Sequence, residues 1–266
     1  MAKQVKPKKA LGQHFLTDQS VARRIAATLD DYKDIPTLEI GPGMGVLTQY
    51  LLPEHRLKVV EIDTESVSYL TETYPQMAAG GDIIEGDFLK MDLAEVFPGT
   101  EQICVIGNYP YNISSQIFFK VLDYKDLVVC CSGMLQREVA ERIAAPEGTK
   151  ARGILSVLLQ MWYDVEYLFT VSENVFNPPP KVKSGVIRLR RNGVTDPECD
   201  WSLFRTVVKT TFGQRRKTLR NSVRSLLPAG AVIPAEADAL LALRPEQLSV
   251  AQFVELTNLV QSLRKA

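Results

Sequence analysis

The sequence predicts an α/β protein in which a doubly wound, mostly parallel sheet is followed by a small all-helical C-terminal domain. Its 266 residues suffice for one large α/β domain with an appendage or for two modest domains. Three observations support this fold class. Strand and helix patterns alternate along the first half, the last two strand patterns have no helix between them, and only helical patterns follow residue 192.

The parallel part of the sheet is predicted from short apolar runs that alternate with helical patterns. After a first helical pattern that follows Asp18, these runs are Thr37–Ile40, Leu57–Asp63, Asp82–Asp87, Ile103–Gly107 and Leu127–Cys131. Helical patterns follow several of them, including one from Thr64 to about Tyr74 and one from Leu135 to Ala144. Strands that alternate with helices at this spacing form parallel, doubly wound sheets.

The edge of the sheet is predicted from two later strand patterns, Tyr163–Phe169 and Gly185–Leu189. They are joined by a segment that contains the proline-rich loop Phe176–Pro180 and shows no helical pattern. Parallel neighbours need a long crossover, usually a helix, so these two strands are expected to form an antiparallel edge pair.

The second domain is predicted from the helical patterns that begin near Asn192. We therefore expect residues 1–192 to form the first domain and residues 193–266 the second. The last helix is expected to begin at Ser249, because Ser249 and Gln252 have the spacing of a capping box.

Composition narrows the function classes. No apolar stretch approaches the length of a membrane span, and the lysine-rich N-terminus lacks the apolar centre of a secretory signal, so we expect a cytoplasmic protein. Cys104, Cys130 and Cys131 lie in apolar runs, which predicts buried thiols. With two histidines in the whole chain, a zinc site is improbable and no metal is expected.

Positive charge is concentrated in three segments, although the formal net charge is zero. Trp201–Ala235 and Asn174–Asn192 contain no acidic residue, and the head of the chain adds lysines that include Lys8 and Lys9. Basic segments of this kind on a neutral protein predict a phosphate-binding face. The alternative is three separate solvated surfaces.

A glycine-rich turn at Gly41–Gly45 follows the first strand, where glycines let the backbone approach a ligand closely. Glu61 ends the second strand and is placed to bind ribose hydroxyls. Dehydrogenases and methyltransferases share both features, although Val46 stands where a dinucleotide loop has its third glycine. Asp87 after the third strand and Asn108 after the fourth favour a nucleoside site along the whole sheet edge.

The tetrapeptide Asn108–Tyr111, Asn-Tyr-Pro-Tyr, emerges from a buried strand at the edge where open α/β sheets bind ligands. Its amide and backbone oxygens can accept hydrogen bonds from an exocyclic amino group, and an aromatic ring can stack on a base. The tetrapeptide resembles the Asn-x-Pro-Tyr motif of adenine N6 methyltransferases.

The resemblance extends over nearly the whole chain. The stretches that carry it are Leu11–Asp18, Glu39–Gly43, Asn108–Ser114, Met134–Val139, Phe176–Val182 and Phe212–Arg220. Together they resemble the rRNA adenine N6-dimethyltransferases, most closely the branch that dimethylates two adjacent adenosines near the 3′ end of small-subunit (16S) rRNA. The resemblance implies a class I S-adenosylmethionine-dependent methyltransferase, Rossmann-like, with a seven-stranded sheet and an antiparallel edge pair.

The family resemblance also implies S-adenosylmethionine as the methyl donor. Carried over by position, its contacts fall on His14, Leu16, Gly41, Gly43, Glu61, Asp87 and Asn108. Glu61 would bind the ribose hydroxyls and Asp87 the adenine amino group. His14 stands where the family has asparagine, and a histidine would make cofactor binding weaken at low pH.

For the target adenine, the resemblance implies that the Asn108 side chain and the Tyr109 carbonyl accept the amino hydrogens. Pro110 restricts the residue before it and would fix the direction of that carbonyl. Tyr111 would stack on the base, with Phe176 on its opposite face. Tyr109 replaces the usual leucine, which is tolerable because this position acts through its backbone.

The predicted partner is 16S rRNA in the immature small ribosomal subunit, with the protein acting as a monomer. The residues expected to hold RNA phosphates are Lys8, Lys9, Arg215, Arg216, Lys217 and Arg220. The alternatives are an assembly factor that acts mainly by binding and a large-subunit rRNA adenine methyltransferase. A Rossmann dehydrogenase is disfavoured, because it leaves Asn108–Tyr111 unexplained.

Overall fold

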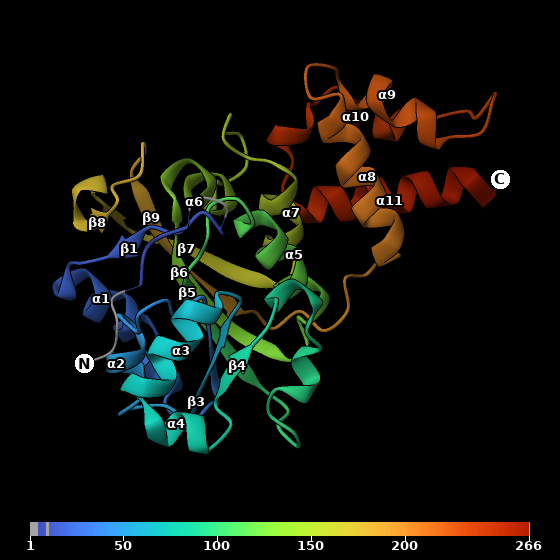
Figure 1. Cartoon of the computed structure of the whole chain (residues 1–266). Helices are drawn as coiled ribbons and strands as arrows, with labels where there is room; N and C mark the ends of the chain where they lie inside the picture. The colour runs from blue at the N-terminus through green and yellow to red at the C-terminus, as the bar shows by residue number, and fades with distance from the viewer. Residues whose placement is uncertain (1–4, 9–10, 266) are drawn as a thin grey trace. The chain divides into compact units, whose positions relative to one another are not determined.

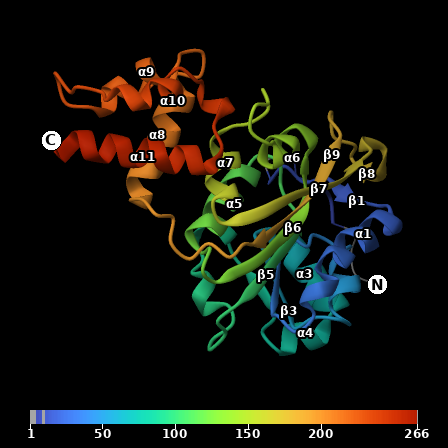
Figure 2. The ribbon, with the colours of Figure 1, turned by 180° about the vertical axis from the view of Figure 1, so that it is seen from behind.

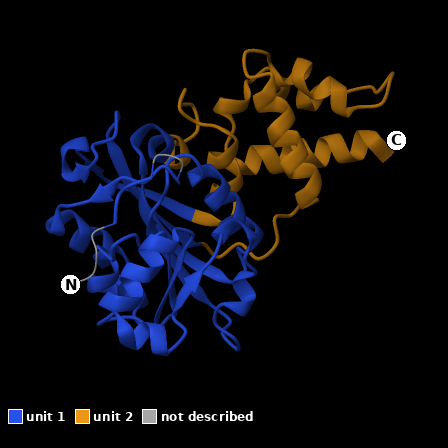
Figure 3. Cartoon of the chain, viewed as in Figure 1, with its two compact units in different colours: residues 1–141, 164–191 blue, residues 142–163, 192–266 orange. Residues whose placement is uncertain are grey.

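The computed structural model describes residues 5–8 and 11–265. The chain divides into two compact units, shown in different colours in Figure 3. The first unit comprises Met1–Glu141 and Asp164–Arg191, and the second comprises Arg142–Tyr163 and Asn192–Ala266. This division differs from the expected pair of contiguous domains, because residues 142–163 cluster with the C-terminal residues.

The first unit is built on a seven-stranded sheet with the order β4-β3-β2-β5-β6-β9-β7 (Figure 1). The strands are β2 (Thr37–Ile40), β3 (Leu57–Glu61), β4 (Ile83–Glu85), β5 (Ile103–Asn108), β6 (Val128–Gln136), β7 (Tyr163–Val171) and β9 (Ser184–Arg191). Strands β2 to β6 pair in parallel, whereas β9 runs antiparallel to β6. The predicted fold class, with its antiparallel edge, is confirmed.

Both faces of the sheet are buried, as a doubly wound fold requires. Successive side chains of a strand point to opposite faces. In β5, Cys104 and Ile106 join a core cluster with Ile25 of helix α1 (Gln19–Ala26), while Val105 is fully buried on the other face. Figure 2 shows β5, β6, β7 and β9 from behind.

The remaining helices of the first unit connect the strands and are short. The α-helices are α2 (Thr48–Leu51), α3 (Thr64–Thr73), α4 (Pro75–Ala79), α5 (Ser114–Asp123) and α6 (Arg137–Ala144), whose last three residues fall in the second unit, and the 3₁₀ helices are η2 (Ala27–Tyr32), η3 (Phe88–Lys90), η4 (Leu93–Glu95) and η5 (Glu173–Val175). Aspartates start several of them. Asp18 accepts hydrogen bonds from the first turn of α1, and Asp63 does so for α3.

A two-stranded sheet that no sequence pattern predicted joins the N-terminal residues to the edge of the first unit. Strand β1 (Phe15–Leu16) pairs antiparallel with β8 (Phe176–Asn177). Each strand has two residues, too few for a periodic pattern to reveal.

The second unit is helical, as expected for the C-terminal domain. Its α-helices are α7 (Ile154–Gln160), α8 (Trp201–Gly213), α9 (Leu219–Ser222), α10 (Asp238–Leu241) and α11 (Val250–Lys265), and its 3₁₀ helices are η6 (Val223–Leu226), η7 (Ala235–Ala237) and η8 (Pro245–Gln247). The predicted capping box starts α11, with Ser249 and Gln252 exchanging two hydrogen bonds.

Aromatic packing explains why residues 142–163 belong to the second unit. The Trp162 ring meets the Trp201 ring of α8 edge to face at 5.3 Å, and Phe204 stacks on Trp201 from the same helix. Helix α8 is the element that α7 contacts most, and Phe204 continues the packing to Phe253 of α11. The apolar side chains of α7 and the Trp162 ring are therefore buried against α8.

Cys104, Cys130 and Cys131 are free thiols and buried, as predicted, while Cys199 is half-buried. Among residues 5–8 and 11–265, no helix combines the length and apolar composition that a membrane span requires.

Candidate active site

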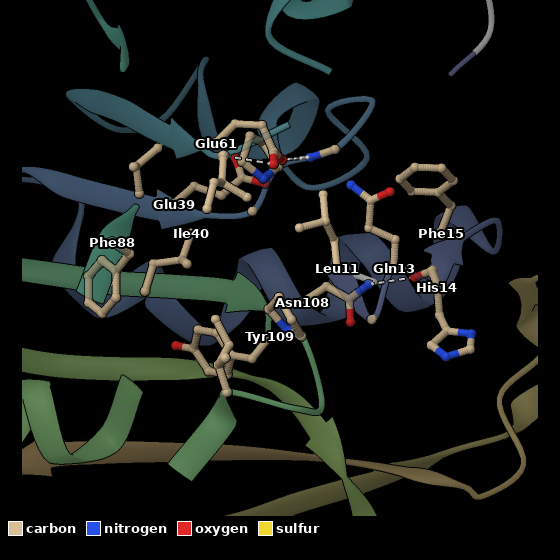
Figure 4. A pocket seen from close by; sticks show the side chains of 18 of the residues that line it. Leu11, Gln13, His14, Phe15, Glu39, Ile40, Glu61, Phe88, Asn108 and Tyr109 are labelled. Carbon is tan, nitrogen blue, oxygen red and sulfur yellow. Dashed lines mark hydrogen bonds between the residues drawn. The ribbon is translucent and has the colours of Figure 1, made fainter. Parts of the chain in front are cut away.

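A pocket in the first unit lies at the carboxyl ends of neighbouring parallel strands (Figure 4). Its lining includes residues 11–16, 39–44, 60–62, 86–88 and 108–111. Because the strands lie in the order β4-β3-β2-β5, the residues that follow or end them, Asp87, Glu61, Gly41 and Asn108, lie in that order along one edge of the sheet. All residues predicted to contact the methyl donor line this pocket, as do Asn108, Tyr109, Pro110 and Tyr111. Their individual roles stay predictions.

Glu61 is held rigidly at the end of β3. One carboxylate oxygen accepts from the Gly43 amide at 3.0 Å, and the other accepts from Ile62 at 2.9 Å and Asp63 at 3.0 Å. Burial raises the pKa of Glu61, and the three backbone donors oppose that rise. Oε2, which in the described part of the chain accepts from Gly43 alone, keeps a lone pair to which a hydroxyl group in the pocket can donate.

The glycine turn is shaped by its backbone angles. Gly41 has φ of +62° and Gly43 has φ of +56°, a region that L side chains rarely adopt. A Cβ added to Gly43 would lie 2.9 Å from the Phe15 ring, whereas one on Gly41 would meet nothing within 4 Å. Gly43 thus permits contact with the N-terminal segment, and Gly41 leaves open space for a ligand.

Glu39 is a pocket residue that the sequence interpretation missed as a functional group. It lies in β2 and is 1% exposed. Burial raises its pKa to about 8, against the effect of the Thr48 hydroxyl, which donates to Glu39 at 2.7 Å. Burial thus favours the neutral, protonated form of Glu39. A charged residue inside an apolar strand run was the signal that could have identified it.

Asp87 has both a capping role and a place in the pocket. Its Oδ1 accepts from the Leu89 amide at 3.0 Å, which starts η3, and its Oδ2 lies 3.7 Å from the Lys90 ammonium group. The side chain is partly exposed and lines the pocket beside Phe88, whose ring is buried. A carboxylate next to an aromatic ring fits a planar base that carries an amino group. Phe88 was not predicted.

The orientation of the Asn108 amide is fixed by the N-terminal segment. Asn108 Nδ2 donates a 3.1 Å hydrogen bond to the carbonyl oxygen of His14, drawn as a dashed line in Figure 4. A carbonyl can only accept, so the amino side of the amide must face His14. The Oδ1 atom is therefore on the other side of the amide group. Asn108 can accept a hydrogen bond there.

The Tyr109 side chain is part of the core beneath the site. It is 1% exposed, and its ring lies against Gly107 of β5 and Gly133 of β6, which are paired in the sheet. A Cβ on Gly133 would come within 2.7 Å of this ring. The two glycines make room for a tyrosine where the family usually has leucine, so only the backbone of Tyr109 can serve the pocket.

Tyr111 and His14 both line the pocket. The Tyr111 hydroxyl shares a 2.6 Å hydrogen bond with Ser184 Oγ, and burial raises its pKa. The His14 ring stacks near the Tyr111 ring with centroids 5.5 Å apart. His14 Nδ1 lies 2.9 Å from the Pro178 carbonyl oxygen, which requires a proton on Nδ1.

Phe176 does not line the pocket. It is 5% exposed, pairs with Leu16 between β8 and β1, and belongs to the core cluster that contains Leu16. To stack on a base opposite Tyr111, the Phe176 ring would have to leave that core. In the described structure it anchors the N-terminal segment instead.

The predicted RNA-binding arginines and lysines differ in their surroundings. Arg215 bonds to the Lys150 carbonyl at 2.5 Å and lies 3.6 Å from Glu246, and Arg220 pairs with Asp238. Arg216 and Lys217, which directly follow Arg215, are exposed in the turn before α9. Arg216 and Lys217 are thus the cations of this stretch best placed to meet an external phosphate.

The other predicted basic residues are engaged within the protein or lie outside the described residues. Lys8 binds Asp63 at 2.5 Å and Glu65 at 3.3 Å, and Lys9 falls outside the described residues. In the basic segment 174–192, Arg188 and Arg190 both pair with Glu166, so charge counted along the sequence overstates the free positive charge there.

Comparisons with known proteins agree with the fold described above. A family described as "Ribosomal RNA adenine dimethylase" matches residues 4–262. A protein of Parabacteroides distasonis named "Ribosomal RNA small subunit methyltransferase A" is 66% identical over 97% of this chain and 95% of its own length. Among solved structures, a dimethyladenosine transferase from Plasmodium falciparum has a TM-score of 0.72 at 24% identity, covering 95% of this chain and 98% of its own. The 23S rRNA methyltransferase ErmE has a TM-score of 0.68 at 26% identity, with 92% and 99% covered. The chain belongs to the ribosomal RNA adenine dimethylase family.

Proposed function

We propose that this protein transfers methyl groups from S-adenosylmethionine to N6 of two adjacent adenosines near the 3′ end of 16S rRNA, giving N6,N6-dimethyladenosine. The observation that carries this proposal is the Asn108 amide. Its amino side is held by the His14 carbonyl, which leaves its oxygen as an acceptor at the end of β5. An acceptor in that position can receive a hydrogen bond from an exocyclic amino group.

The residues present fit S-adenosylmethionine as the donor. Glu61 offers a free lone pair to a ribose hydroxyl, and Asp87 with Phe88 suits an adenine ring and its amino group. When bound, the donor supplies a methyl group already activated by its sulfonium centre.

The protein's own task is alignment and electrostatics. The adenine amine is a weak nucleophile, because its lone pair is delocalised into the ring. Asn108 Oδ1 and the Tyr109 carbonyl would accept its two hydrogens, which favours a tetrahedral nitrogen with the lone pair directed at the methyl group. Pro110 limits the conformations of Tyr109, and the buried Tyr109 ring limits them further. The second transfer uses an amine with one remaining hydrogen.

The target adenosine has to be unpaired or extruded, since its amino group otherwise takes part in base pairing. We expect Arg216 and Lys217 to bind RNA phosphates, because both are exposed beside paired arginines. The partner would be the immature small subunit, met in the cytoplasm by a monomer. Identity of 66% to a small-subunit methyltransferase, against 26% to ErmE, favours small-subunit over large-subunit rRNA.

The deciding experiment supplies labelled S-adenosylmethionine and unmethylated small subunits, with large subunits in parallel. Nuclease digestion and mass spectrometry then identify the modified nucleoside and its position. We expect N6,N6-dimethyladenosine in the small-subunit RNA alone. Label in the large subunit would support the alternative substrate, and no transfer to adenosine N6 would refute the enzymatic proposal.

The assembly-factor alternative makes a different prediction. If binding were the essential act, Asn108→Ala protein would restore subunit maturation in a strain that lacks the enzyme, although its RNA stayed unmethylated. If methylation is the function, the defect of that strain persists with the variant.

A further inference from the structure

The N-terminal segment, residues 11–17, is held at both ends beside the pocket. At its C-terminal end, the Thr17 amide donates to the Val175 carbonyl at 2.8 Å, and β1 pairs with β8. At its N-terminal end, Lys8 and Gln13 reach Asp63, two residues after Glu61. Between Lys8 and Thr17 the chain supplies six consecutive pocket-lining residues, Leu11 to Leu16.

The attachment at Asp63 is an ion pair supported by amide contacts. Lys8 Nζ lies 2.5 Å from Asp63 Oδ1, and Gln13 Nε2 donates to Oδ2 at 3.2 Å. The Lys8 amide donates to the Gln13 side-chain oxygen at 2.9 Å, so both residues are also tied to each other. Asp63 is 2% exposed, and a buried carboxylate requires such partners.

Burial disfavours the charged form of Asp63, yet the hydrogen bonds from Lys8, Gln13 and Ser66 outweigh it and lower its pKa. The carboxylate is therefore ionised at neutral pH. Asp63 also starts helix α3, since its Oδ1 accepts from the Glu65 amide at 3.3 Å. The ion pair thus links the N-terminal segment to the helix that follows the ribose-binding strand.

The same segment fixes the amide at the reacting end. The His14 carbonyl, one residue after Gln13, accepts the hydrogen bond that orients Asn108. Displacement of His14 removes the only group among the described residues that is seen to hold the amino side of this amide. The amide would then be free to turn its NH2 towards the target amine, where two donors would face each other.

We propose that Asp63 is a positioning residue for methyl transfer: through Lys8 and Gln13 it holds the N-terminal segment, whose His14 carbonyl orients Asn108. The chain of contacts runs from the donor side of the pocket to the acceptor amide. It assigns Lys8 an internal role in place of a direct role in RNA binding. This inference rests on the proposed function of Asn108.

The test compares Asp63→Asn with Asp92→Asn. Asparagine is a good N-cap, so Asp63→Asn keeps the start of α3 but loses the charge that binds Lys8. Asp92 likewise starts a helical turn by accepting from Ala94, and it does not line the pocket. We expect Asp63→Asn to lower the single-turnover rate about tenfold or more, as misplacement of a reacting group does, with RNA affinity within twofold. Asp92→Asn should keep the wild-type rate.

Lys8 provides a second variant that leaves the buried carboxylate in place. Lys8→Met removes the ion pair from a side chain that is 39% exposed, and Lys8→Arg retains it. If Lys8 holds the segment, Lys8→Met slows transfer at unchanged RNA affinity and Lys8→Arg restores the rate. If Lys8 instead binds phosphate, Lys8→Met weakens RNA binding at an unchanged saturated rate, and the proposal is overturned.

Hydrogen exchange separates this inference from the proposed function, because it needs no turnover. In Asp63→Asn and Lys8→Met, amides of residues 11–17 should exchange faster, while those of β5 keep their wild-type protection. Unchanged exchange in residues 11–17 refutes the inference even if the wild type methylates RNA. If these variants exchange faster but the wild type transfers no methyl group, the attachment through Asp63 is supported and only the proposed function is refuted.

Discussion

The Tyr109 hydroxyl donates a 2.6 Å hydrogen bond to the backbone carbonyl oxygen of Ser132. This contact joins the tetrapeptide at the end of β5 to the middle of β6. It shows that Tyr109 is more than a tolerated replacement for leucine, because its polar end is satisfied inside the core. Burial, with Cys131 alongside, raises the pKa of Tyr109 well above its ordinary value, so the hydroxyl stays protonated.

Tyr109→Phe should destabilise the protein by about 1 kcal/mol, the usual net value of one internal hydrogen bond. Gly133→Ala should cost more, about 3 kcal/mol for overpacking, because its Cβ would lie 2.3 Å from the Gly107 carbonyl oxygen. Urea unfolding of both variants measures these differences. Equal stability of Gly133→Ala and wild type would show that the tyrosine ring does not need the glycine surface.

Asn108→Ala should reduce methyl transfer about 100-fold or more, the usual scale for loss of one preorganised polar group. Asn108→Asp should fail as well, although it is nearly the same size, because a carboxylate cannot donate to the His14 carbonyl. Single-turnover assays at saturating donor measure both rates, and filter binding measures subunit affinity. Loss of subunit binding in parallel with activity would contradict the role assigned to Asn108.

The buried Glu39 should make stability depend on pH. Its pKa of about 8 in the folded protein exceeds the ordinary value of 4.5, so the neutral form is favoured by folding. The resulting stabilisation is complete below about pH 4.5 and is lost as the pH rises through about 8. Glu39→Gln removes this contribution, on the order of 4 kcal/mol between pH 4 and 9. Thermal unfolding across that range should give a flatter curve for the variant, and parallel curves would exclude a neutral Glu39.

Arg216→Ala with Lys217→Ala should weaken RNA binding and reduce its salt dependence by about two phosphate contacts. The matched control is Arg215→Ala with Arg220→Ala, which removes two residues paired inside the unit. The control should lower the melting temperature more and the salt slope less. Titration of small-subunit RNA at several salt concentrations distinguishes them. If both double variants change the salt dependence of RNA binding equally, ion pairs within the protein do not prevent Arg215 and Arg220 from binding RNA.

The sheet and the site at its edge were predictable from sequence because both follow from local patterns. Glu61 and Asn108 end apolar runs, and the ends of parallel strands meet at one edge. Glu39 escaped this reasoning because it lies within a strand, where its carboxyl group is buried beside the glycine turn. Whether a polar residue within a strand has a functional role depends on how deeply it is buried, and the sequence pattern alone does not reveal burial.

Pairings between distant residues were not predictable. Arg215 and Arg220 appear as free cations in the sequence, yet Glu246 and Asp238 neutralise them through the packing of the helical unit. Phe176 has the chemistry to stack on a base, but its pairing with Leu16 places it in the core. Helix α7 likewise reads as part of the first domain and packs against α8 in the second unit.

The pairing of β1 with β8 also has a consequence for biosynthesis. His14 bonds to Pro178 across a sequence separation of 164 residues, and Thr17 bonds to Val175 across 158. A ribosome therefore releases most of the sheet before the N-terminal wall of the pocket has a partner. Contacts of such long range close slowly and late in folding. A nascent chain should thus acquire its methyl-donor site only after residue 178 has left the exit tunnel.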